Sequence, residues 1–386
     1  MKDVDVLIVG AGLAGLHCAY CLALNGLEVV LVDKKERLDV VHTTGIFVRR
    51  TLEDFEIADE YLGPPIKHVS LFSPAYRRQD FDSCHDEFRF ARMRQLYESC
   101  LQQCQRRGVS WLAGTRYMGS SFGSDGARVQ LRSQHTDHEI CTRFIVGADG
   151  VKSAVAKDLG LSLNRKWIVG VENLLAGNLP AGPPRLFCFL NPRLAPGYIC
   201  WIAYDGLEAH VGVGGYASRF DPIASLCKFQ ANVSHIFDLT GATQLERRGG
   251  RIPVGGILPR LANKNGLLIG DAAGAASPLT AGGLDPCLRL SRLAAEVIPD
   301  FLKSGNPQSL NRYCGRTFRR HFSSRLWARR VLQTIDSPLL IELACLTLSL
   351  RPVKALSRNI FFGHGSFPDV RVRSLLPDGY EIVGPL

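Results

Sequence analysis

The hydrophobic positions of the chain include three short runs that each lead directly into a glycine-containing segment. These runs occupy residues 4–9, 144–146 and 266–269 and consist mainly of valine, leucine, isoleucine and phenylalanine. Continuous apolar runs of this length are typical of parallel strands that are buried on both faces. We therefore predict three buried strands, each of which ends in a glycine-containing turn.

The stretches between these strands predict helices and a second sheet. Helices are expected over about 13–26, 93–107 and 283–302, where glycine ends the first two. Residues 61–90 alternate between apolar and polar positions, and residues 164–261 combine short strands with glycine and proline turns. Both patterns favour antiparallel strands.

These patterns divide the chain into three parts, which suits a length of 386 residues. A discontinuous α/β domain comprises residues 1–60, 88–163 and 262–303. A second domain, an antiparallel sheet, comprises residues 61–87 and 164–261. Residues 304–386 form a helical C-terminal region and tail.

The first predicted strand leads into a turn with the pattern of a phosphate-binding site. The turn consists of Gly10, Ala11, Gly12, Leu13, Ala14 and Gly15. Gly10 permits the tight turn, Gly12 lets the backbone approach a pyrophosphate, and Gly15 lets the helix pack close to the strand. The free N–H groups and the dipole of the helix favour the phosphate charge.

An acidic residue follows at the spacing that dinucleotide sites use. The strand at 28–32 ends at Asp33, which lies 18 residues after Gly15. A carboxylate that binds the ribose hydroxyls is expected about 20 residues on. Lys34 follows directly and is included in the predicted cofactor site. The order strand, turn, helix, strand and acid predicts a bound dinucleotide.

Two later segments indicate that the chain returns to the same dinucleotide. Gly147-Ala148-Asp149-Gly150 follows the second buried run, and Gly270-Asp271-Ala272-Ala273-Gly274 follows the third. The three segments together predict FAD as the cofactor. FAD limits the chemistry to oxidation and reduction.

Composition adds that the chain can bury a large core, because 46% of its residues are hydrophobic and 21% are charged. The chain contains no run of 18 apolar residues, so no membrane-spanning helix is predicted.

The twelve cysteines are irregularly spaced. Cys18, Cys21, Cys100 and Cys104 fall inside predicted helices, so we expect packing roles and no metal site. The cytoplasm, or the cytosolic face of a membrane, is the expected location.

Part of the net charge of +10 is concentrated in residues 316–330, which hold six arginines among aromatic residues. Three interpretations remain open: a solvated helix face, a patch that meets an anionic membrane or an acidic substrate group, and a nucleic-acid site. No nucleic-acid module is recognisable elsewhere. The apolar residues 338–350 are too short to span a bilayer and suit either a core helix or an interface. Peripheral membrane contact through residues 316–350 is therefore one candidate interaction, whereas a nucleic-acid partner is not expected.

The three glycine-containing segments, in this order, resemble the flavoprotein superfamily of p-hydroxybenzoate hydroxylase over roughly residues 1–303. The resemblance implies a Rossmann-type FAD-binding domain beside an antiparallel-sheet substrate domain. It also implies that Asp149 touches the flavin side of the site and that Asp271 binds the ribityl chain. Arg94 resembles the superfamily arginine that approaches the cofactor, with Arg92 as an alternative. The helix after the third segment is expected to point its N-terminus at the flavin.

Within the superfamily, the chain is most similar to the geranylgeranyl reductases. Gly274 stands where aromatic hydroxylases usually have histidine, and Asp285 stands near their asparagine. The segment 270–274, followed by 278–283, is similar to the reductases, and Gly282, Gly283 and the following Leu284 are expected to contact FAD. Thr44 and Gly45 occupy the place of a Cys-Gly pair and are assigned to the same site.

Tyr198, Trp201 and Tyr204 resemble the aromatic segment that lines the isoprenoid pocket of these reductases. One extra residue separates Tyr198 from Trp201, and Tyr204-Asp205 replaces Phe-Pro. In a regular strand Tyr198 and Tyr204 share one face and Trp201 takes the other, so all three cannot face one pocket. Packing of these rings in a core is the alternative.

Two reactions follow from the resemblance. In the first, reduced FAD gives hydride to a carbon–carbon double bond of a hydrophobic prenyl substrate. In the second, reduced FAD and oxygen hydroxylate or epoxidise the substrate. Halogenation and a non-catalytic flavin-binding scaffold are weaker alternatives. NAD(P)H or a reduced electron carrier would supply the electrons. The sequence favours the reductase and leaves the substrate, the donor and the oligomeric state open.

Overall fold

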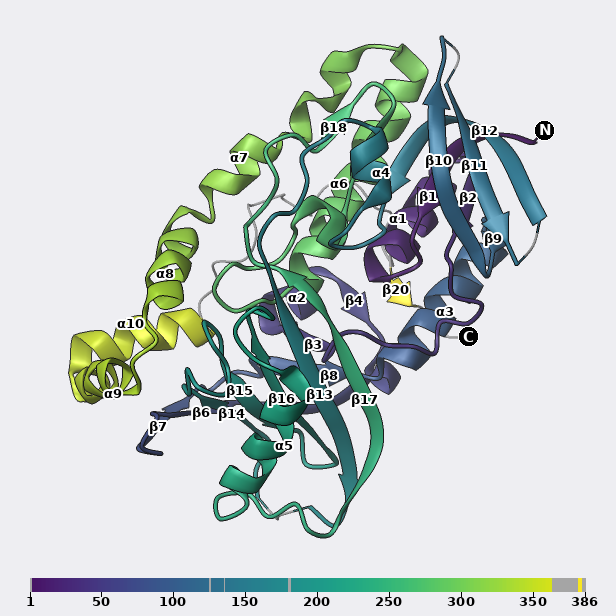
Figure 1. The fold of residues 1–386 in the computed structure, drawn as a ribbon. Helices are drawn as coiled ribbons and strands as arrows, with labels where there is room; N and C mark the ends of the chain where they lie inside the picture. The colour runs from purple at the N-terminus through teal and green to yellow at the C-terminus, as the bar shows by residue number, and fades with distance from the viewer. Residues whose placement is uncertain (1, 125, 135, 180–181, 363–380, 384–386) are drawn as a thin grey trace.

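The computed structural model describes residues 2–124, 126–134, 136–179, 182–362 and 381–383. Its first sheet has eight strands (Figure 1). The parallel part runs in the order β9 (Ser110–Leu112), β2 (Val29–Val32), β1 (Lys2–Val9), β12 (Thr136–Gly147) and β19 (Gly266–Leu268). The antiparallel additions are β10 (Thr115–Phe122), β11 (Ala127–Ser133) and β18 (Ala262–Asn263). The three predicted runs therefore lie in one parallel arrangement.

Three helices pack on this sheet, and they match the predicted ones. They are α1 (Leu13–Leu24), α3 (Met93–Arg106) and α6 (Leu284–Ser304). Helix α1 is buried on most sides, between α3 and α6, and even His17 is only 2% exposed. The His17 Nδ1 atom lies 2.7 Å from Ser291 Oγ of α6. Burial lowers the pKa of His17 to about 3, so the imidazole is neutral at physiological pH.

The four helical cysteines pack in the core, as predicted. Cys18 and Cys21 of α1 and Cys100 and Cys104 of α3 are free buried thiols. Cys104 Sγ donates to the carbonyl oxygen of Leu16 at 3.3 Å. Burial raises the pKa of Cys100 to about 12, which keeps this thiol protonated. These side chains act as small apolar residues between the helices.

The second sheet has seven strands, which are antiparallel except for the parallel pair of β14 and β6. Their order is β17 (Ala242–Pro253), β13 (Trp167–Gly177), β16 (Glu208–Gly215), β15 (Cys200–Tyr204), β14 (Arg185–Phe189), β6 (His68–Phe72) and β7 (Arg78–Asp82). Helix α5 (Pro222–Val233) packs on one face over a core that includes Phe189, Val211 and Phe229. The opposite face carries His210, Gly212 and Trp201, because side chains alternate along each strand.

A small sheet links the two larger ones. Its strands are β3 (Ile46–Val48), β8 (Phe88–Ala91) and β5 (Leu62–Ile66). These strands come from both sides of the predicted boundaries at residues 60 and 87. The nearby elements are α2 (Arg49–Asp54), β4 (Glu56–Ile57) and the 3-10 turn η1 (Asp59–Tyr61). Helix α4 (Ala154–Asp158) packs on the first sheet, against β10, β12 and β19. The confirmed fold class is thus α/β with a Rossmann-type domain and a second antiparallel sheet.

The C-terminal region is helical and runs along one side of the molecule to a tip (Figure 1). Its elements are η3 (Pro307–Arg312), α7 (Gly315–Arg320), α8 (Ser323–Thr334), α9 (Pro338–Leu346), η4 (Thr347–Ser349) and α10 (Arg351–Phe362). Among the described residues no helix is both long and apolar enough to cross a membrane. The predicted tail lies largely outside the described residues, but β20 (Glu381–Val383) pairs with β4.

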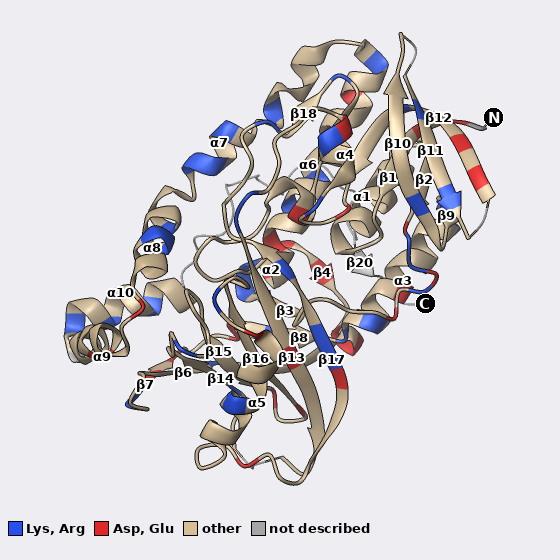
Figure 2. Cartoon of the chain, in the orientation of Figure 1, with Lys and Arg blue, Asp and Glu red and all other residues tan. Residues whose placement is uncertain are grey.

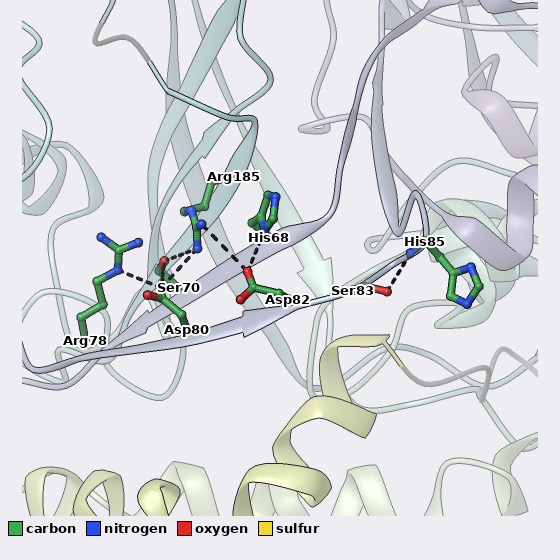
Figure 3. A network of polar contacts seen from close by, with 8 residues as sticks. All are labelled: His68, Ser70, Arg78, Asp80, Asp82, Ser83, His85 and Arg185. Atoms are coloured by element: carbon green, nitrogen blue, oxygen red, sulfur yellow. Dashed lines mark hydrogen bonds and ion pairs between the residues drawn. The ribbon is translucent and has the colours of Figure 1, made fainter.

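A polar network holds the edge hairpin on which these helices rest (Figure 3). Asp80 Oδ1 accepts hydrogen bonds from Ser70 Oγ at 2.6 Å and from Arg185 Nη1 at 3.2 Å. Although burial alone would raise it, these donors hold the pKa of Asp80 below its usual value. On the same hairpin, Phe81 packs against Phe361 of α10 with ring centres 5.5 Å apart. The hairpin therefore anchors the helical tip to the second sheet.

Candidate functional site

The three glycine-containing segments meet at the carboxyl ends of β1, β12 and β19. A Cβ atom on Gly10 would lie 2.3 Å from the carbonyl oxygen of Ala148, and Gly10 has a φ of +109°. A Cβ atom on Gly270 would lie 2.9 Å from Cβ of Ala14. Ala148 N–H also donates to the Val9 carbonyl at 2.8 Å. The fold thus brings the predicted segments together at one edge, where Rossmann-type domains bind dinucleotides.

The first turn has the free space that a pyrophosphate needs. No atom lies within 4 Å of a Cβ atom built on Gly12, whereas one on Gly15 would lie 1.9 Å from the Gly10 carbonyl oxygen. No side chain caps the N-terminus of α1 at Gly12. The N–H groups at this end can therefore bind a phosphate. Leu13 and Ala14 form the buried first turn of the helix.

Asp33 fixes the position of the glycine-rich turn. Its Oδ2 accepts a hydrogen bond from the Ala11 backbone N–H at 2.7 Å, and its Oδ1 accepts one from Lys35 N–H at 2.9 Å. The carboxylate is partly exposed and retains further lone pairs that can accept ribose hydroxyls. The side chain of Lys34 is exposed beside it. Ribose binding by Asp33 stays a prediction.

Asp149 has a structural partner that the sequence did not indicate. Its Oδ2 accepts hydrogen bonds from the N–H groups of Ala154 at 2.7 Å and Val155 at 3.2 Å, at the start of α4. Its Oδ1 is buried and has no hydrogen-bond partner within the described residues. Burial raises the pKa of Asp149. The predicted flavin contact therefore rests on Oδ1 alone.

Asp271 lies in a 3-10 turn, η2 (Gly270–Ala273), next to the N-terminus of α6. A Cβ atom on Gly283 would lie 3.7 Å from Asp271 Oδ1, so the third segment and the Gly282-Gly283-Leu284 segment adjoin. No hydrogen-bond donor to this carboxyl group is found in the described part of the chain. Desolvation by the surrounding protein raises the pKa of Asp271 to about 7. A hydroxyl donor from a ligand would stabilise the ionised form.

Thr44 and Gly45 lie beside the start of α3. Gly45 has a φ of +84°, and a Cβ atom on it would lie 2.7 Å from Met93 Cγ. The exposed Arg92 and Arg94 flank Met93, which places both predicted arginines near this loop. A role for either arginine in FAD binding stays a prediction.

Glu172, which the sequence analysis missed, links the Thr44 loop to the second sheet. It is 3% exposed, and its Oε2 accepts hydrogen bonds from Thr44 Oγ1 at 2.7 Å and from Trp201 Nε1 at 3.2 Å. Its Oε1 lies 3.3 Å from His210 Nδ1. Burial alone would raise its pKa, but His210, Thr44 and Arg248 hold the pKa of Glu172 below its usual value. No sequence motif marks this residue, because its partners are distant in the chain.

The three predicted substrate aromatics separate into two groups. Tyr204 packs against Phe237 on the α5 side of the sheet, with ring centres 5.6 Å apart. Trp201 lies on the opposite face, and Tyr198 meets it edge-on with ring centres 6.4 Å apart. The expectation that Tyr198 shares the Tyr204 side is wrong, because β15 begins only at Cys200 and strand alternation does not extend to Tyr198. A substrate pocket can thus contain Tyr198 and Trp201 together.

Glycines make room for the Trp201 indole. A Cβ atom on Gly212 would lie 2.2 Å from Trp201 Cζ2, and one on Gly214 would lie 2.8 Å from Tyr198 Cδ1 and 3.5 Å from Trp201 Cζ3. Both glycines are on β16, next to Trp201 in the sheet. The indole therefore lies flat against bare backbone, and its N–H reaches Glu172.

Comparisons with known proteins agree with this arrangement. The FAD binding domain family matches residues 3–181. A digeranylgeranylglycerophospholipid reductase of Methanocella arvoryzae is 26% identical over 81% of this chain and 82% of that protein. The protein of the same name from Methanocaldococcus jannaschii is 27% identical over 89% of this chain and 90% of that protein.

Solved structures share the fold. A geranylgeranyl bacteriochlorophyll reductase-like protein from Thermoplasma acidophilum has a TM-score of 0.81 at 18% identity, over 91% of this chain and 92% of that chain. The flavin-dependent monooxygenase PieE, solved with FAD and substrate, has a TM-score of 0.69 at 18% identity, over 98% and 76%.

The fold and the matched domain define the class of protein: this chain is an FAD-dependent oxidoreductase. Its resemblance to the p-hydroxybenzoate hydroxylase superfamily is confirmed, and the proteins to which it is similar include geranylgeranyl-type reductases and a flavin-dependent monooxygenase. The residues present fit FAD: the space at Gly12 suits its pyrophosphate, and Asp149 Oδ1 is a buried acceptor without a partner among the described residues. Desolvation raises the pKa of Asp271, which a hydroxyl donor from FAD would offset.

Substitution of Gly12 is expected to affect FAD binding, whereas substitution of Gly15 is expected to affect the stability of the fold. Gly12 has an extended backbone conformation that valine also adopts, so we expect Gly12→Val to fold and to lose FAD affinity at least about 100-fold. Gly15→Ala should destabilise the fold itself by about 3 kcal/mol or more, because its Cβ meets backbone. Flavin absorbance and thermal unfolding of both purified variants measure this. A yellow Gly12→Val protein would contradict the pyrophosphate site.

The raised pKa of Asp271 predicts a pH dependence of FAD binding. If ribityl hydroxyls donate to this carboxyl group, binding favours its ionised form and lowers its pKa below about 7. FAD affinity should then rise with pH by up to about tenfold per unit below pH 7 and level off above it. Fluorescence titration between pH 5.5 and 8 measures this. The matched variant Asp271→Asn should bind FAD with little pH dependence, and a flat profile in the wild type would exclude the contact.

Proposed function

We propose that this chain reduces carbon–carbon double bonds in the prenyl chain of a lipid. The observation that carries the proposal is that relatives named digeranylgeranylglycerophospholipid reductase align over 81–89% of the chain. The Tyr198–Trp201 pair supports it, because the two rings offer an apolar surface beside the predicted cofactor site. The electron donor would be NAD(P)H or a reduced electron carrier.

Several residues would hold FAD and its reduced form. The turn at Gly10–Gly15 and Asp33 would bind the adenine nucleotide half, and Asp271 the ribityl chain. When bound, FAD supplies a two-electron hydride carrier for the double bond. The N-terminus of α6, at Gly283, would favour the negative charge of the reduced cofactor, because a helix of 21 residues carries partial positive charge there.

The chain's own residues would orient the substrate. Trp201 is fixed from two sides, since its ring rests on Gly212 and its Nε1 donates to Glu172. Tyr198 is fixed by donation of its hydroxyl to the Thr280 carbonyl at 2.7 Å. Thr280 lies in the loop that leads into α6. The loop before α6 therefore contacts Tyr198 and also leads into the helix at the predicted flavin site, so it fixes the position of one relative to the other.

Anaerobic reoxidation distinguishes the proposed reaction from oxygenation. We expect the reduced protein to regain the absorbance of oxidised flavin when a geranylgeranyl substrate is added without oxygen, and to yield a product two hydrogens heavier per turnover. If a hydroxylated or epoxidised product forms, and only in the presence of oxygen, the protein is a monooxygenase and the reductase proposal is wrong. If neither the geranylgeranyl substrate nor oxygen reoxidises the reduced flavin, the protein catalyses neither reaction.

The tip formed by α8, α9 and α10 supports peripheral contact with a membrane. Helix α9 has no buried residue, and its Leu339 is 66% exposed and its Leu343 52% exposed. The acidic residues of this tip are neutralised, because Glu342 pairs with Arg77 at 2.9 Å and Asp336 pairs with Arg219. The exposed cations of the tip are Arg330, Arg351, Lys354 and Arg358. Figure 2 shows lysine and arginine positions in blue on this part of the molecule. We propose that anionic lipid headgroups meet these cations while the leucines enter the interface.

Flotation with vesicles tests this contact. The wild-type protein should float with phosphatidylglycerol-containing vesicles and less with phosphatidylcholine vesicles. The double variant Leu339→Asp and Leu343→Asp should lower the partition at least about tenfold, because each buried leucine contributes roughly 1.5 kcal/mol or more. Leu245→Asp is the matched control, since Leu245 is 56% exposed on β17. Equal flotation of all three proteins would refute the role of the tip.

A further inference from the structure

Two arginines of helix α8 point inward while two of its apolar side chains point outward, the reverse of what an ordinary surface helix shows at such positions. Arg329 is 1% exposed, and Arg325, one turn earlier, is partly buried. On the outer side Trp327 is 67% exposed and Val331 37% exposed. Arginine is rarely buried so fully unless it is paired. A cation as fully buried as Arg329 therefore requires a partner.

Aromatic rings fix the guanidinium group of Arg329. Its Cζ lies 5.2 Å from the centre of the Tyr216 ring and 5.7 Å from the centre of the Tyr198 ring. Its Nε donates to Tyr216 Oη at 3.1 Å, and Gln333 Nε2 donates to the same oxygen. The two rings and one hydrogen bond hold the guanidinium group in place, but they leave its Nη1 and Nη2 atoms without a hydrogen-bond acceptor among the described residues.

The distal edge of the Arg329 guanidinium group is buried without a hydrogen-bond partner in the described part of the chain. Its Nη1 and Nη2 atoms are buried, and neither forms a hydrogen bond within the described residues. These atoms carry four N–H donors. Leaving them unsatisfied in a buried position is costly, and an anion with several acceptor oxygens would satisfy them. The planar fork matches phosphate in particular.

The second cation and the loop before α6 lie next to this edge. Arg325 Nη1 donates to Ser277 Oγ at 3.3 Å. Ser277 belongs to the loop whose Thr280 carbonyl accepts the Tyr198 hydroxyl. Residues four apart on a helix lie on the same side, about 5–6 Å apart. Arg325 and Arg329 thus lie on the same side of α8, next to Tyr198 and to the loop that holds the Tyr198 hydroxyl.

We propose that Arg329, supported by Arg325, binds the phosphate group at the polar end of the substrate. This inference rests on the proposed function, because Tyr198 would then lie between the phosphate and the part of the prenyl chain that rests on Trp201. The chemistry is that of a phosphate or diphosphate ester, which either a phospholipid or a soluble prenyl diphosphate provides. Helix α8, which carries both arginines, is also part of the proposed membrane tip, so a lipid substrate would enter from that side.

Paired ligands that differ only in phosphate test the site. Geranylgeranyl diphosphate is compared with geranylgeraniol, and digeranylgeranylglyceryl phosphate with digeranylgeranylglycerol, by titration of the FAD-loaded protein. The wild type should bind the phosphorylated member about 10- to 100-fold more tightly. The preferred pair identifies the source of the phosphate. Equal affinity within both pairs would overturn the inference.

Variants of the two arginines test whether these residues cause the tighter binding of the phosphorylated ligands. Arg329→Gln should reduce it to threefold or less while FAD affinity stays unchanged, and Arg325→Gln should reduce it in part. Arg320→Gln is the control, because Arg320 is an exposed arginine of α7, outside the proposed membrane tip. If Arg329→Gln does not fold, Arg329→Lys and Arg325→Gln make the same comparison. An undiminished preference in the folded variants would refute the assignment.

Inorganic diphosphate separates this inference from the proposed function. Calorimetry should detect its binding to the wild type and not to Arg329→Gln, whether or not any alkene is reduced. Binding without alkene reduction would remove the proposed function and keep the anion site. Alkene reduction with no preference for phosphate would keep the function and remove the anion site.

Discussion

The backbones of Gly10, Gly15 and Gly270 approach their neighbours more closely than any side chain permits. Gly10 lies against Ala148, Gly15 against Gly10, and Gly270 against Ala14, so three turns from distant parts of the chain are packed into one edge of the sheet. Because a side chain at any of these glycines would overlap its neighbour, the turns pack directly on one another, and the strands that lead into them set their positions. The predicted cofactor site, and the loop that carries Thr280 and α6, take their positions from this packing.

The sequence predicted this part of the molecule well because its signals are local. A continuous apolar run, a glycine and a carboxylate at a set spacing each report on a few neighbouring residues. The strands at 4–9 and 266–269 and the helices from Leu13 and Met93 accordingly appear near their predicted bounds. Contacts between distant residues were not predictable: Asp149 caps α4, and β5 joins β3 and β8 in a separate small sheet.

The predicted substrate-binding face, which carries Trp201 and Tyr198, depends more strongly on contacts between residues that are distant in the chain. Glu172 receives hydrogen bonds from Thr44 and Trp201, which lie 128 and 29 residues away in the chain. No spacing rule connects such residues, so a lone buried glutamate in a strand gave no signal. Tyr198 was misplaced for a related reason, since the start of β15 is set by pairing with β14 and β16. Pattern alone does not locate that start to within two residues.

The contact between Trp201 and Gly212 has a consequence for how this surface can change. The strand position opposite the indole has no room for even one methyl group, so the two sites share a fixed volume. A larger residue at 212 is compatible only with a smaller ring at 201. The space that a smaller ring leaves would then open on the face of the sheet that carries Trp201, where we propose that the substrate binds. Divergence among related chains should therefore alter these two positions as a pair, and with them the length of chain that the surface accommodates.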